Sequence, residues 1–556
     1  MADYYQWERW AWNEERDLSA YKGWACDTKD TQRTRSVLDI WMLLEVYSDY
    51  VPYGAEWFQI PTSKGVDYRL KDGWMYITPN IVPEKDRPKR EAEFRKRIAP
   101  WVEDMEGQYR GDVAELDKHA ENIKALCQNA KKLNAGELKR AFEDWIYFYR
   151  TTAEYHFRWM YAFCMVAGMF NDLCSELAGV DIHHPLFKDL MGGFTHKVIE
   201  TDSEMWRLSR MAVETGLAPV FKSTKNNKEL LRKISQQGEK GKNWLDELQK
   251  VLKVHGWRTS RNWDMSSASW IEDPTLTFPA IKIFLDQPVF PAHKVAHEQA
   301  IARQQAEKEL ISRIPETQKG WFEKLLKGAQ WANIIQEEHP FYTEQVGNST
   351  GRFLTKEIGE RWAREGAVDD PEDIYYLLPE EIFIRIIPSF KFSPKHIVQR
   401  RREQHKQFRK AEPQMFLGDQ NAFFEALQYE PLAKSVISPA PQVKPELKAA
   451  LYGTVASPGV VEGIARVMFT MEEAVEFRPG EVIVTVETNV QWNPLFSIAA
   501  GVITDGGGVL SHASIVGREY GIPVVSGTLE GTRKIKTGMR VRVDGNVGAV
   551  YFLDKA

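Results

Sequence analysis

Apolar side chains recur every three to four residues along most of the first 430 positions. The repeat is clearest at 145–174 and 203–217, and it is typical of helices that bury one face. The sequence has no internal repeat of fixed period. We therefore expect residues from about 90 to 430 to form one large helical domain, or two that pack together.

Shorter signals mark turns and helix ends in the same region. Asp72-Gly73 separates two strand-like runs, which predicts a β-hairpin over 66–78. Asp370 before Pro371 is typical of a helix N-cap followed by proline at the first helical position. Residues 7–15 have a helical pattern. We expect a mixed N-terminal segment, residues 1–90, that packs on the helical domain.

The pattern changes after a proline-rich stretch at 434–448, which predicts an extended, semi-stiff linker. The residues beyond it are rich in Gly and Val. Short strand-like runs follow at 465–469, 482–486, 501–504, 523–525, 540–543 and 549–552. The expected fold class is multidomain α+β: a large, mostly helical domain at 91–433, then a compact α/β domain at 449–556.

Composition narrows the class of protein. The 556 residues carry a formal net charge of −5, which argues against a nucleic-acid partner. Four cysteines without a Cys-x-x-Cys pair suggest neither a zinc cage nor a disulfide framework, and they favour a cytoplasmic location. The N-terminus does not resemble a signal peptide. The longest apolar run, at 160–170, is too short to span a membrane.

Aromatic residues are abundant, with 19 Trp, 20 Tyr and 27 Phe, most of them before residue 430. Such a content fits a large aromatic core. It also fits a pocket for a flat or bulky organic substrate, because such pockets are lined by aromatic side chains. Composition alone leaves both interpretations open.

The strongest chemical signal surrounds His512. A predicted strand ends near Thr504, a triple glycine follows, and a short helix is expected from Ser511 to Gly521. His512 would then lie in the first helical turn, where free N–H groups and the helix dipole favour an anion. A neutral imidazole is a nucleophile that can carry a phosphoryl group. The spacing alone equally fits a capping or turn histidine.

Residues 507–523 also resemble a known signature. Their sequence, Gly-Gly-x-x-Ser-His-Ala-x-Ile-Val-x-Arg-Glu-x-Gly-Ile-Pro, is similar to the phosphohistidine motif in the mobile domain of phosphoenolpyruvate-utilising enzymes, and the similarity continues at 456–463, 492–496 and 543–548. The resemblance implies that 449–556 is a swivelling domain and that His512 is phosphorylated. The residues expected to support the phosphate-carrying loop are Gly506, Gly507, Gly508, Ser511 and Ala513.

Leu510 departs from the family pattern, because many dikinases have a regulatory threonine there. This departure puts dikinase-type control in doubt, but not the carrier role. The helical block is more diffusely similar to the substrate domain of rifampicin phosphotransferase. The matching pieces lie at 192–208, 255–274, 337–342 and 369–377. The resemblance implies that 91–433 binds the substrate.

Full-length relatives usually begin with an ATP-grasp domain that charges the histidine. The first 430 residues show no strand-rich nucleotide-binding pattern, and no pyruvate-processing barrel is expected. Such a split arrangement resembles phenylphosphate synthase of anaerobic aromatic degradation. The resemblance implies a phosphotransferase subunit charged from ATP and Mg²⁺ at a separate ATP-grasp subunit, with AMP and phosphate as products. The acceptor would be the hydroxyl of a small phenol-like aromatic substrate.

Transfer from phosphohistidine needs cations against the phosphoryl oxygens and a base near the hydroxyl. Arg258 and Lys197 are the candidate cations, although a structural ion pair and a surface lysine are the alternatives. The candidate bases are Glu337, Glu338 and His339, which would otherwise face water or cap a helix. His156, His183, His184 and His196 are expected to be core or surface residues. No metal-ligand motif is present in the sequence.

Two other functions remain open at this stage. One keeps the enzyme class but changes the substrate to a rifamycin-type antibiotic or another secondary metabolite. The other is a non-catalytic scaffold or regulator that retains a swivelling domain. The intact Ser511-His512-Ala513 argues against a scaffold, because a degenerate domain would be expected to lose the histidine first.

Overall fold

The computed structural model describes residues 22–27, 35–182, 184–259, 263–386, 392–411, 413–436, 444–469, 471–508 and 511–553. The predicted helix at 7–15, His183, Leu510 and residues 437–443 of the predicted linker at 434–448 lie outside these residues. Within them, no helix is both long and apolar enough to cross a membrane.

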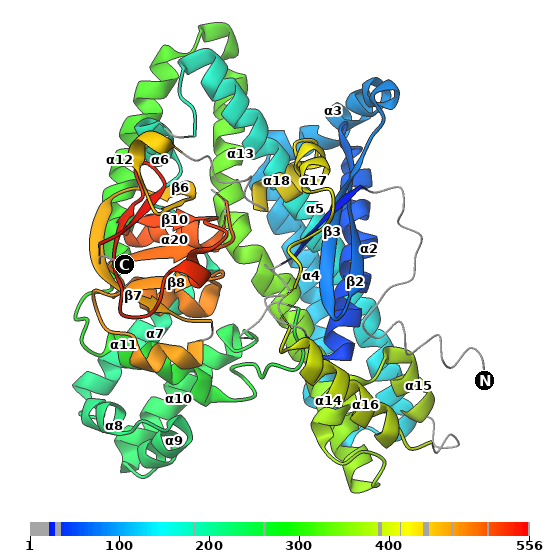
Figure 1. Ribbon diagram of the computed structural model, residues 1–556. Helices are drawn as coiled ribbons and strands as arrows, with labels where there is room; N and C mark the ends of the chain where they lie inside the picture. Colours follow the sequence, from blue (N-terminus) through cyan, green and yellow to red (C-terminus); the bar gives the residue numbers. More distant parts are fainter. Residues whose placement is uncertain are drawn as a thin grey trace.

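A four-stranded antiparallel sheet lies in the right half of Figure 1. Its order is β2-β3-β1-β4, with the strands β1 (Gly23–Cys26), β2 (Ser63–Lys71), β3 (Trp74–Ile81) and β4 (Phe416–Gly418). The predicted hairpin is confirmed. Asp72 and Gly73 both have positive φ, 52° and 76°, as a two-residue turn between right-twisted strands requires. The fourth strand comes from far along the chain and ties residue 416 to the N-terminal segment.

The predicted helical block is confirmed. Its helices in chain order are α2 (Val37–Phe58), α3 (Arg87–Glu103), α4 (Met105–Gln128), α5 (Ala135–Ala178), α6 (Pro185–Leu190), α7 (Lys197–Glu214), α8 (Ala218–Ser223), α9 (Asn227–Ser235), α10 (Gly238–His255), α11 (Phe278–Phe284), α12 (Pro291–Arg313), α13 (Glu316–Pro340), α14 (Val346–Arg364), α15 (Pro379–Ile386), α16 (Lys395–Phe408), α17 (Gln420–Leu427) and α18 (Pro431–Val436). The predicted N-cap Asp370 begins a 3₁₀ turn, η5 (Pro371–Tyr376), rather than an α-helix.

Two long helical elements form the backbone of this region. Helix α5 begins at a capping box made by Asn134 and Glu137 and ends at Gly179, whose φ is 65°. Helices α13 and α14 are joined without a break by a π-helical turn, η4 (Phe341–Gln345). The Trp145 indole N–H donates to the Gly347 carbonyl at 3.0 Å, across the contact between α5 and α14.

The C-terminal region is a separate α/β fold, drawn in orange to red on the left of Figure 1. Its eight strands have the order β5-β12-β11-β7-β8-β9-β10-β6. They are β5 (Leu451–Tyr452), β6 (Thr454–Ser457), β7 (Val460–Val467), β8 (Val482–Thr485), β9 (Gly501–Thr504), β10 (Val524–Ser526), β11 (Arg540–Asp544) and β12 (Ala549–Phe552). Its helices are α19 (Asn493–Phe496), α20 (His512–Tyr520) and α21 (Gly531–Lys534). The six strands predicted from the sequence are confirmed, and β5 and β6 are additional.

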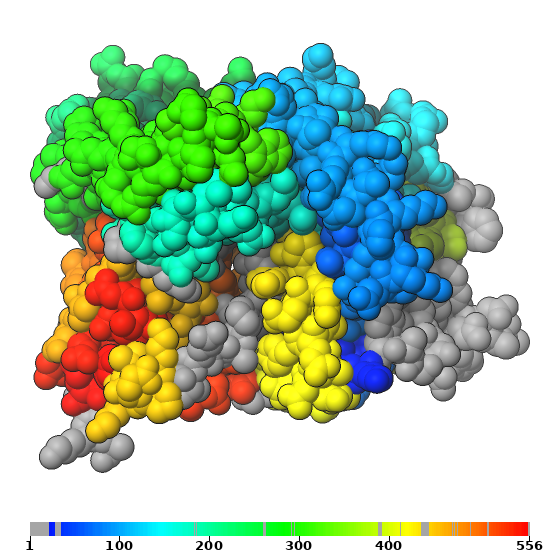
Figure 2. Space-filling model, turned by 90° about the horizontal axis from the view of Figure 1, so that it is seen from above, coloured from blue at the N-terminus to red at the C-terminus, as the bar shows by residue number. Residues whose placement is uncertain are grey.

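The C-terminal domain packs against the helical region through apolar side chains. One continuous cluster of buried residues contains Ile199 and Phe284 from the helical region, and Trp492, Phe496 and Tyr520 from the C-terminal domain. A second, smaller cluster is confined to the C-terminal sheet. Figure 2 shows the same arrangement from above, with the orange-to-red domain against the green helices. Docking therefore buries apolar surface, which favours association.

The contact between α5 and α14 predicts opposite effects for two glycine substitutions. A Cβ on Gly351 would lie 2.3 Å from the Trp145 ring, whereas Gly168 in α5 has open space around it. We expect Gly351→Ala to destabilise the protein by about 1–3 kcal/mol through overpacking. Gly168→Ala should stabilise it by roughly 0.5–1 kcal/mol, because alanine favours a helix. Urea unfolding followed by circular dichroism measures both. Equal midpoints for the two variants would contradict this packing.

Candidate active site

His512 is placed by a strand, a glycine loop and a helix that follow one another. Strands β9 and β10 are parallel, and α20 connects them. The loop after Thr504 therefore leaves the carboxyl end of β9, where ligands bind in parallel sheets. Ser511 is the extended N-cap residue of α20 and makes no side-chain cap, so His512 lies in an uncapped first turn. This turn can present N–H groups to an anion.

The glycines before His512 pack tightly within their own domain. A Cβ on Gly506 would lie 2.5 Å from Glu487 Oε1. Gly507 has a φ of 100°, and a Cβ there would lie 2.7 Å from Ser511 Oγ. The Gly508 carbonyl accepts a hydrogen bond from the Ser514 hydroxyl at 2.7 Å. These contacts give the glycines a role in shaping the loop.

The His512 ring lies in a nearly closed environment. Its Nδ1 is 2.9 Å from Thr488 Oγ1, and Phe496 lies edge-on to it at 6.2 Å between ring centres. The Nε2 atom is buried, has no hydrogen-bond partner, and is 3.8 Å from Glu337 Oε2. Donation from Nδ1 to the Thr488 oxygen leaves the lone pair on Nε2, which faces the helical region.

Electrostatics keep this imidazole neutral. Burial lowers the pKa of His512 to about 3, and the nearby positive charges of His196 and Arg258 add to the effect. A neutral ring retains the nucleophilic lone pair that protonation would remove. At neutral pH, His512 is therefore an uncharged nucleophile whose reactive nitrogen has no hydrogen-bond partner among the described residues.

The three candidate bases on α13 point in different directions. Glu337 faces His512, and burial raises its pKa to about 8. Burial also raises the pKa of Glu338, whose carboxylate accepts a hydrogen bond from the Lys197 backbone N–H. His339 faces α5 instead, with its ring 4.6 Å from that of His156. Consecutive helical residues point about 100° apart, so these three adjacent side chains face three different parts of the structure.

Arg258 is buried where α7 meets the π turn. Its Nη2 donates to the Lys197 carbonyl at 3.1 Å and to Thr201 Oγ1 at 2.8 Å, and its guanidinium lies 5.0 Å from the Phe341 ring centre. Burial lowers the pKa of Arg258 to about 10. The Nε atom has no hydrogen-bond partner. Arg258 thus joins α7 to η4 and retains one unused donor.

Lys197 is the first residue of α7 and is partly exposed. Its Nζ lies 3.4 Å from Glu200 Oε2 and 5.7 Å from the Phe341 ring centre. The two candidate cations therefore both contact the Phe341 ring. The structure brings both of them to the start of α7, beside Glu338.

Sequence reasoning set aside a histidine that lies at the centre of the domain contact. His196 is fully buried at the N-cap of α7, and its Nε2 forms an ion pair with Glu519 of α20. One residue further along α20, the Tyr520 hydroxyl donates to Asp202 Oδ2 at 3.1 Å. Glu519 is part of the signature at 507–523, and this was the sequence feature that could have pointed to its contact with His196.

Two further histidines named from the sequence, His184 and His156, make contacts within the helical region. His184 Nδ1 accepts a hydrogen bond from the Leu186 N–H at the start of α6. His156 lies in the core of the helical region, against α13. Away from the ion pair, Gln287 Nε2 donates to Ser497 Oγ at 3.0 Å, which adds a further polar contact between the domains.

The buried ion pair makes domain docking dependent on pH. Burial lowers the pKa of His196, but the carboxylate of Glu519 outweighs this and raises it to about 9, with Glu337 and Glu338 adding to the rise. After release from the interface the imidazole would titrate near 6.5. The docked state binds the proton more tightly than the undocked state. The stabilisation of docking by the ion pair is therefore complete below about pH 6.5 and is lost as pH rises through about 9.

We therefore expect the C-terminal domain to separate from the helical region more readily at pH 9.5 than at pH 6.5. Small-angle X-ray scattering should show the radius of gyration increasing across this interval. His196→Gln should remove most of the change, whereas His405→Gln, at a buried histidine that contacts Tyr376, should retain it. The same pH response in wild type and His196→Gln would refute the role of the pair.

Comparisons with known proteins agree with the two halves of this site. Residues 155–336 match the family model of the rifampicin phosphotransferase fourth domain. Residues 477–548 match the model of the PEP-utilising enzyme mobile domain. The first match contains His196, Lys197 and Arg258, and the second contains His512.

Relatives match across both parts. The chain is 29% identical to chondramide synthase of Chondromyces crocatus over 86% of its own length and 12% of that protein. It is 26% identical to the uncharacterized phosphotransferase YvkC of Bacillus subtilis, over 75% of the chain and 49% of the relative.

Rifampicin phosphotransferase of Bacillus cereus is 29% identical over 56% of the chain and 35% of the relative. The chain thus spans about half, or less, of the length of these relatives. These matches confirm the resemblance drawn from the signature: residues 477–548 are similar to the mobile domain of phosphoenolpyruvate-utilising enzymes, and residues 155–336 are similar to a domain of rifampicin phosphotransferase.

Proposed function

We propose that the chain is a phosphotransferase in which His512 Nε2 carries a phosphoryl group and passes it to a hydroxyl group held by the helical region. The observation that carries this proposal is the neutral His512, whose unpartnered Nε2 lies 3.8 Å from Glu337 of the other domain. A carrier histidine needs a free lone pair, and a transfer site needs a base within reach.

The chemistry divides into two displacements at the β-phosphorus of ATP, with one hydrolysis between them. In the first, the Nε2 lone pair forms a bond to the β-phosphorus and the bridging oxygen leaves with AMP; water then cleaves the bond to the γ-phosphorus and phosphate is released. In the second, the substrate hydroxyl oxygen attacks the same phosphorus, the N–P bond breaks, and its electrons return to Nε2. The hydroxyl proton passes to the Glu337 carboxylate. The products are a phosphate monoester and the neutral imidazole.

Two kinds of group can stabilise the transferred phosphoryl oxygens. Arg258 offers its unpartnered Nε, and Lys197 carries a charge at the start of α7. The uncapped first turn of α20 adds backbone N–H groups. Positive groups placed against these oxygens stabilise the charge of the transition state, as phosphoryl transfer requires.

The charging reaction belongs to a second protein in this proposal. The strands of the described residues form two sheets, the four-stranded N-terminal sheet and the eight-stranded C-terminal sheet. Neither sheet is assigned to ATP binding in this proposal. We infer that a separate ATP-grasp subunit, binding ATP and Mg²⁺, phosphorylates His512 and releases AMP and phosphate. The C-terminal domain would then move from that subunit to the docked position.

A phenol-like aromatic hydroxyl compound is the proposed acceptor. Phe341 contacts both candidate cations, and Phe496 lies against His512, so the site offers aromatic surface on both domains. A phenolic hydroxyl has a pKa of about 10 and needs less help from a base than an alkyl hydroxyl does. The second candidate is a rifamycin-type antibiotic or another secondary metabolite, which the rifampicin phosphotransferase relatives favour.

The carrier role predicts a single labelled residue. After incubation with an ATP-grasp partner and ATP labelled at the β-phosphate, His512 should carry the label, and His512→Asn should carry none. His405→Asn, at a buried histidine outside the site, should be labelled like wild type. Mass spectrometry at alkaline pH locates the label. If a partner proven active on another acceptor leaves this chain unlabelled, the chain is better explained as a scaffold.

The base role predicts a pH profile for the second step. Burial raises the pKa of Glu337 to about 8, and the base must be deprotonated to act, so discharge should accelerate as pH rises and level off above about 8. Glu337→Gln should slow single-turnover discharge to phenol by about 10²–10⁴-fold and flatten the profile. Glu338→Gln is the matched control variant. A larger loss of discharge rate in Glu338→Gln than in Glu337→Gln would assign the base role to Glu338.

A further inference from the structure

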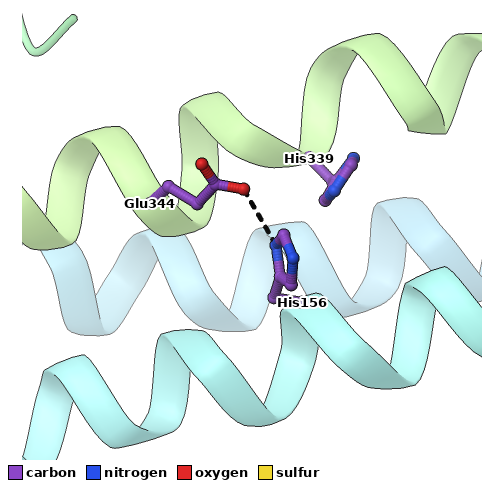
Figure 3. A group of neighbouring side chains, drawn as sticks. All are labelled: His156, His339 and Glu344. Atoms are coloured by element: carbon purple, nitrogen blue, oxygen red, sulfur yellow. Dashed lines mark ion pairs between the residues drawn. The ribbon is translucent and has the colours of Figure 1, made fainter. Parts of the chain in front are cut away.

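Three ionisable side chains meet inside the helical region, on the side of α13 that faces away from His512. His156 comes from α5, His339 from α13 and Glu344 from the π turn η4. Each is buried, and one possible ligand atom from each residue lies within 4.8 Å of those from the other two. Figure 3 shows His156 rising from one helix towards the space between His339 and Glu344 of the other.

The π turn is what brings the carboxylate to this face. His339 and Glu344 are five residues apart, and an α-helix would place such residues about 140° from each other. The wider turn at Phe341–Gln345 reduces this angle, so both side chains point at α5. Such turns are rare and occur frequently at functional sites. Pro340, which has no N–H to donate, stands directly before the turn.

The ring nitrogens are oriented by neighbouring oxygen atoms. His339 Nδ1 lies 2.8 Å from the Ile335 carbonyl, so this nitrogen carries the proton and Nε2 is the possible ligand atom of the ring. This arrangement is characteristic of metal-binding histidines, which donate their second nitrogen to a carbonyl or carboxylate. The Thr343 hydroxyl donates to the His339 carbonyl and lies 3.3 Å from His156 Nδ1, beside Glu344.

The separations suit one small ion. His156 Nδ1 is 3.5 Å from Glu344 Oε1, and an ion between these two atoms would replace the proton that this nitrogen donates to the Thr343 oxygen. Ligand atoms bound about 2.0–2.2 Å from a tetrahedral zinc ion lie about 3.3 Å apart. Small side-chain rotations of His339 would bring its nitrogen to the same distance. Imidazole favours zinc, cobalt and other borderline transition metals over magnesium or calcium, which prefer oxygen ligands.

A fourth polar side chain extends the same helical face. Asn348 lies one turn beyond Glu344, is fully buried, and has no hydrogen-bond partner at either atom of its side-chain amide. Buried amides are nearly always hydrogen-bonded in folded proteins. Asn348 is therefore a buried amide, one turn from Glu344, whose hydrogen-bonding capacity the described residues leave unused.

We propose that His156, His339 and Glu344 bind one divalent transition-metal ion, with zinc as the best fit. The surrounding side chains are aromatic: Phe157, Phe163 and Trp263 contact the two imidazole rings. Three protein ligands leave a coordination position for water or for an amide oxygen. The ion would join α5 to the π turn and so hold the end of α13, which carries Glu337 on its opposite side.

The test uses the full-length chain and the metal alone. Apo-protein prepared with a chelator and then transferred to chelator-free buffer is titrated with Co²⁺, followed by Zn²⁺. Co²⁺ should bind with a stoichiometry of about one and give the intense visible absorption of tetrahedral coordination by nitrogen and oxygen. Zn²⁺ should displace it, and saturating Zn²⁺ should raise the melting temperature, because an ion that binds only the folded state stabilises it.

The variants separate this site from adventitious binding. His339→Gln and Glu344→Gln should each weaken Zn²⁺ binding by at least about 100-fold, more than the loss of a supporting residue does. His405→Gln, at a buried histidine with an aromatic neighbour, should bind like wild type. Circular dichroism checks that each variant folds. If a variant fails to fold, X-ray absorption of the wild-type Co²⁺ complex decides whether two imidazoles coordinate the ion.

Two results would overturn the proposal. One is a wild-type chain that gives only the weak spectrum of hydrated Co²⁺ and no thermal shift with Zn²⁺, which would leave a hydrogen-bonded polar cluster. The other is retention of full Zn²⁺ affinity in folded His339→Gln and Glu344→Gln, which would place the ion elsewhere on the chain.

Discussion

The contact between His196 and Glu519 is the constraint on which the arrangement of the site depends. It joins the N-cap of α7 to α20, and both of those elements carry residues of the proposed transfer site. A buried ion pair contributes little net stability, but the loss of one partner leaves an uncompensated charge. The pair therefore selects a register between the domains, while the shared apolar cluster supplies most of the attraction.

Helix α13 connects this contact to the rest of the helical region. One side of its last turn presents Glu337 to His512, the next residue contacts the start of α7, and His339 faces α5. The π turn continues the helix into α14 without a break. A single helical turn thus joins the interface, the candidate cations and the buried core, which explains why these residues are close together along the sequence.

Much of the fold could be predicted because the signals were local. The Asp72-Gly73 turn, the strand ends in the C-terminal domain and the helix from His512 to Gly521 each follow from adjacent residues. The direction of His339 could not be predicted, because it depends on a π turn and on packing against α5. The role of His196 depends on Glu519, more than 300 residues away. Tertiary contacts of this kind have no periodic pattern along the chain.

A short, reducible cross-link that holds the docked state tests the central claim most directly. Gln287 and Ser497 are hydrogen-bonded across the interface, so Gln287→Cys with Ser497→Cys would place two thiols that a short bifunctional thiosulfonate reagent can join. The native cysteines are buried and form no disulfide with one another. If the docked state is the transfer state, chain phosphorylated before cross-linking should discharge to its acceptor when locked. The cross-linked chain should resist new phosphorylation by the partner until the cross-link is reduced. A locked chain that cannot discharge, or that is charged normally, would contradict the account.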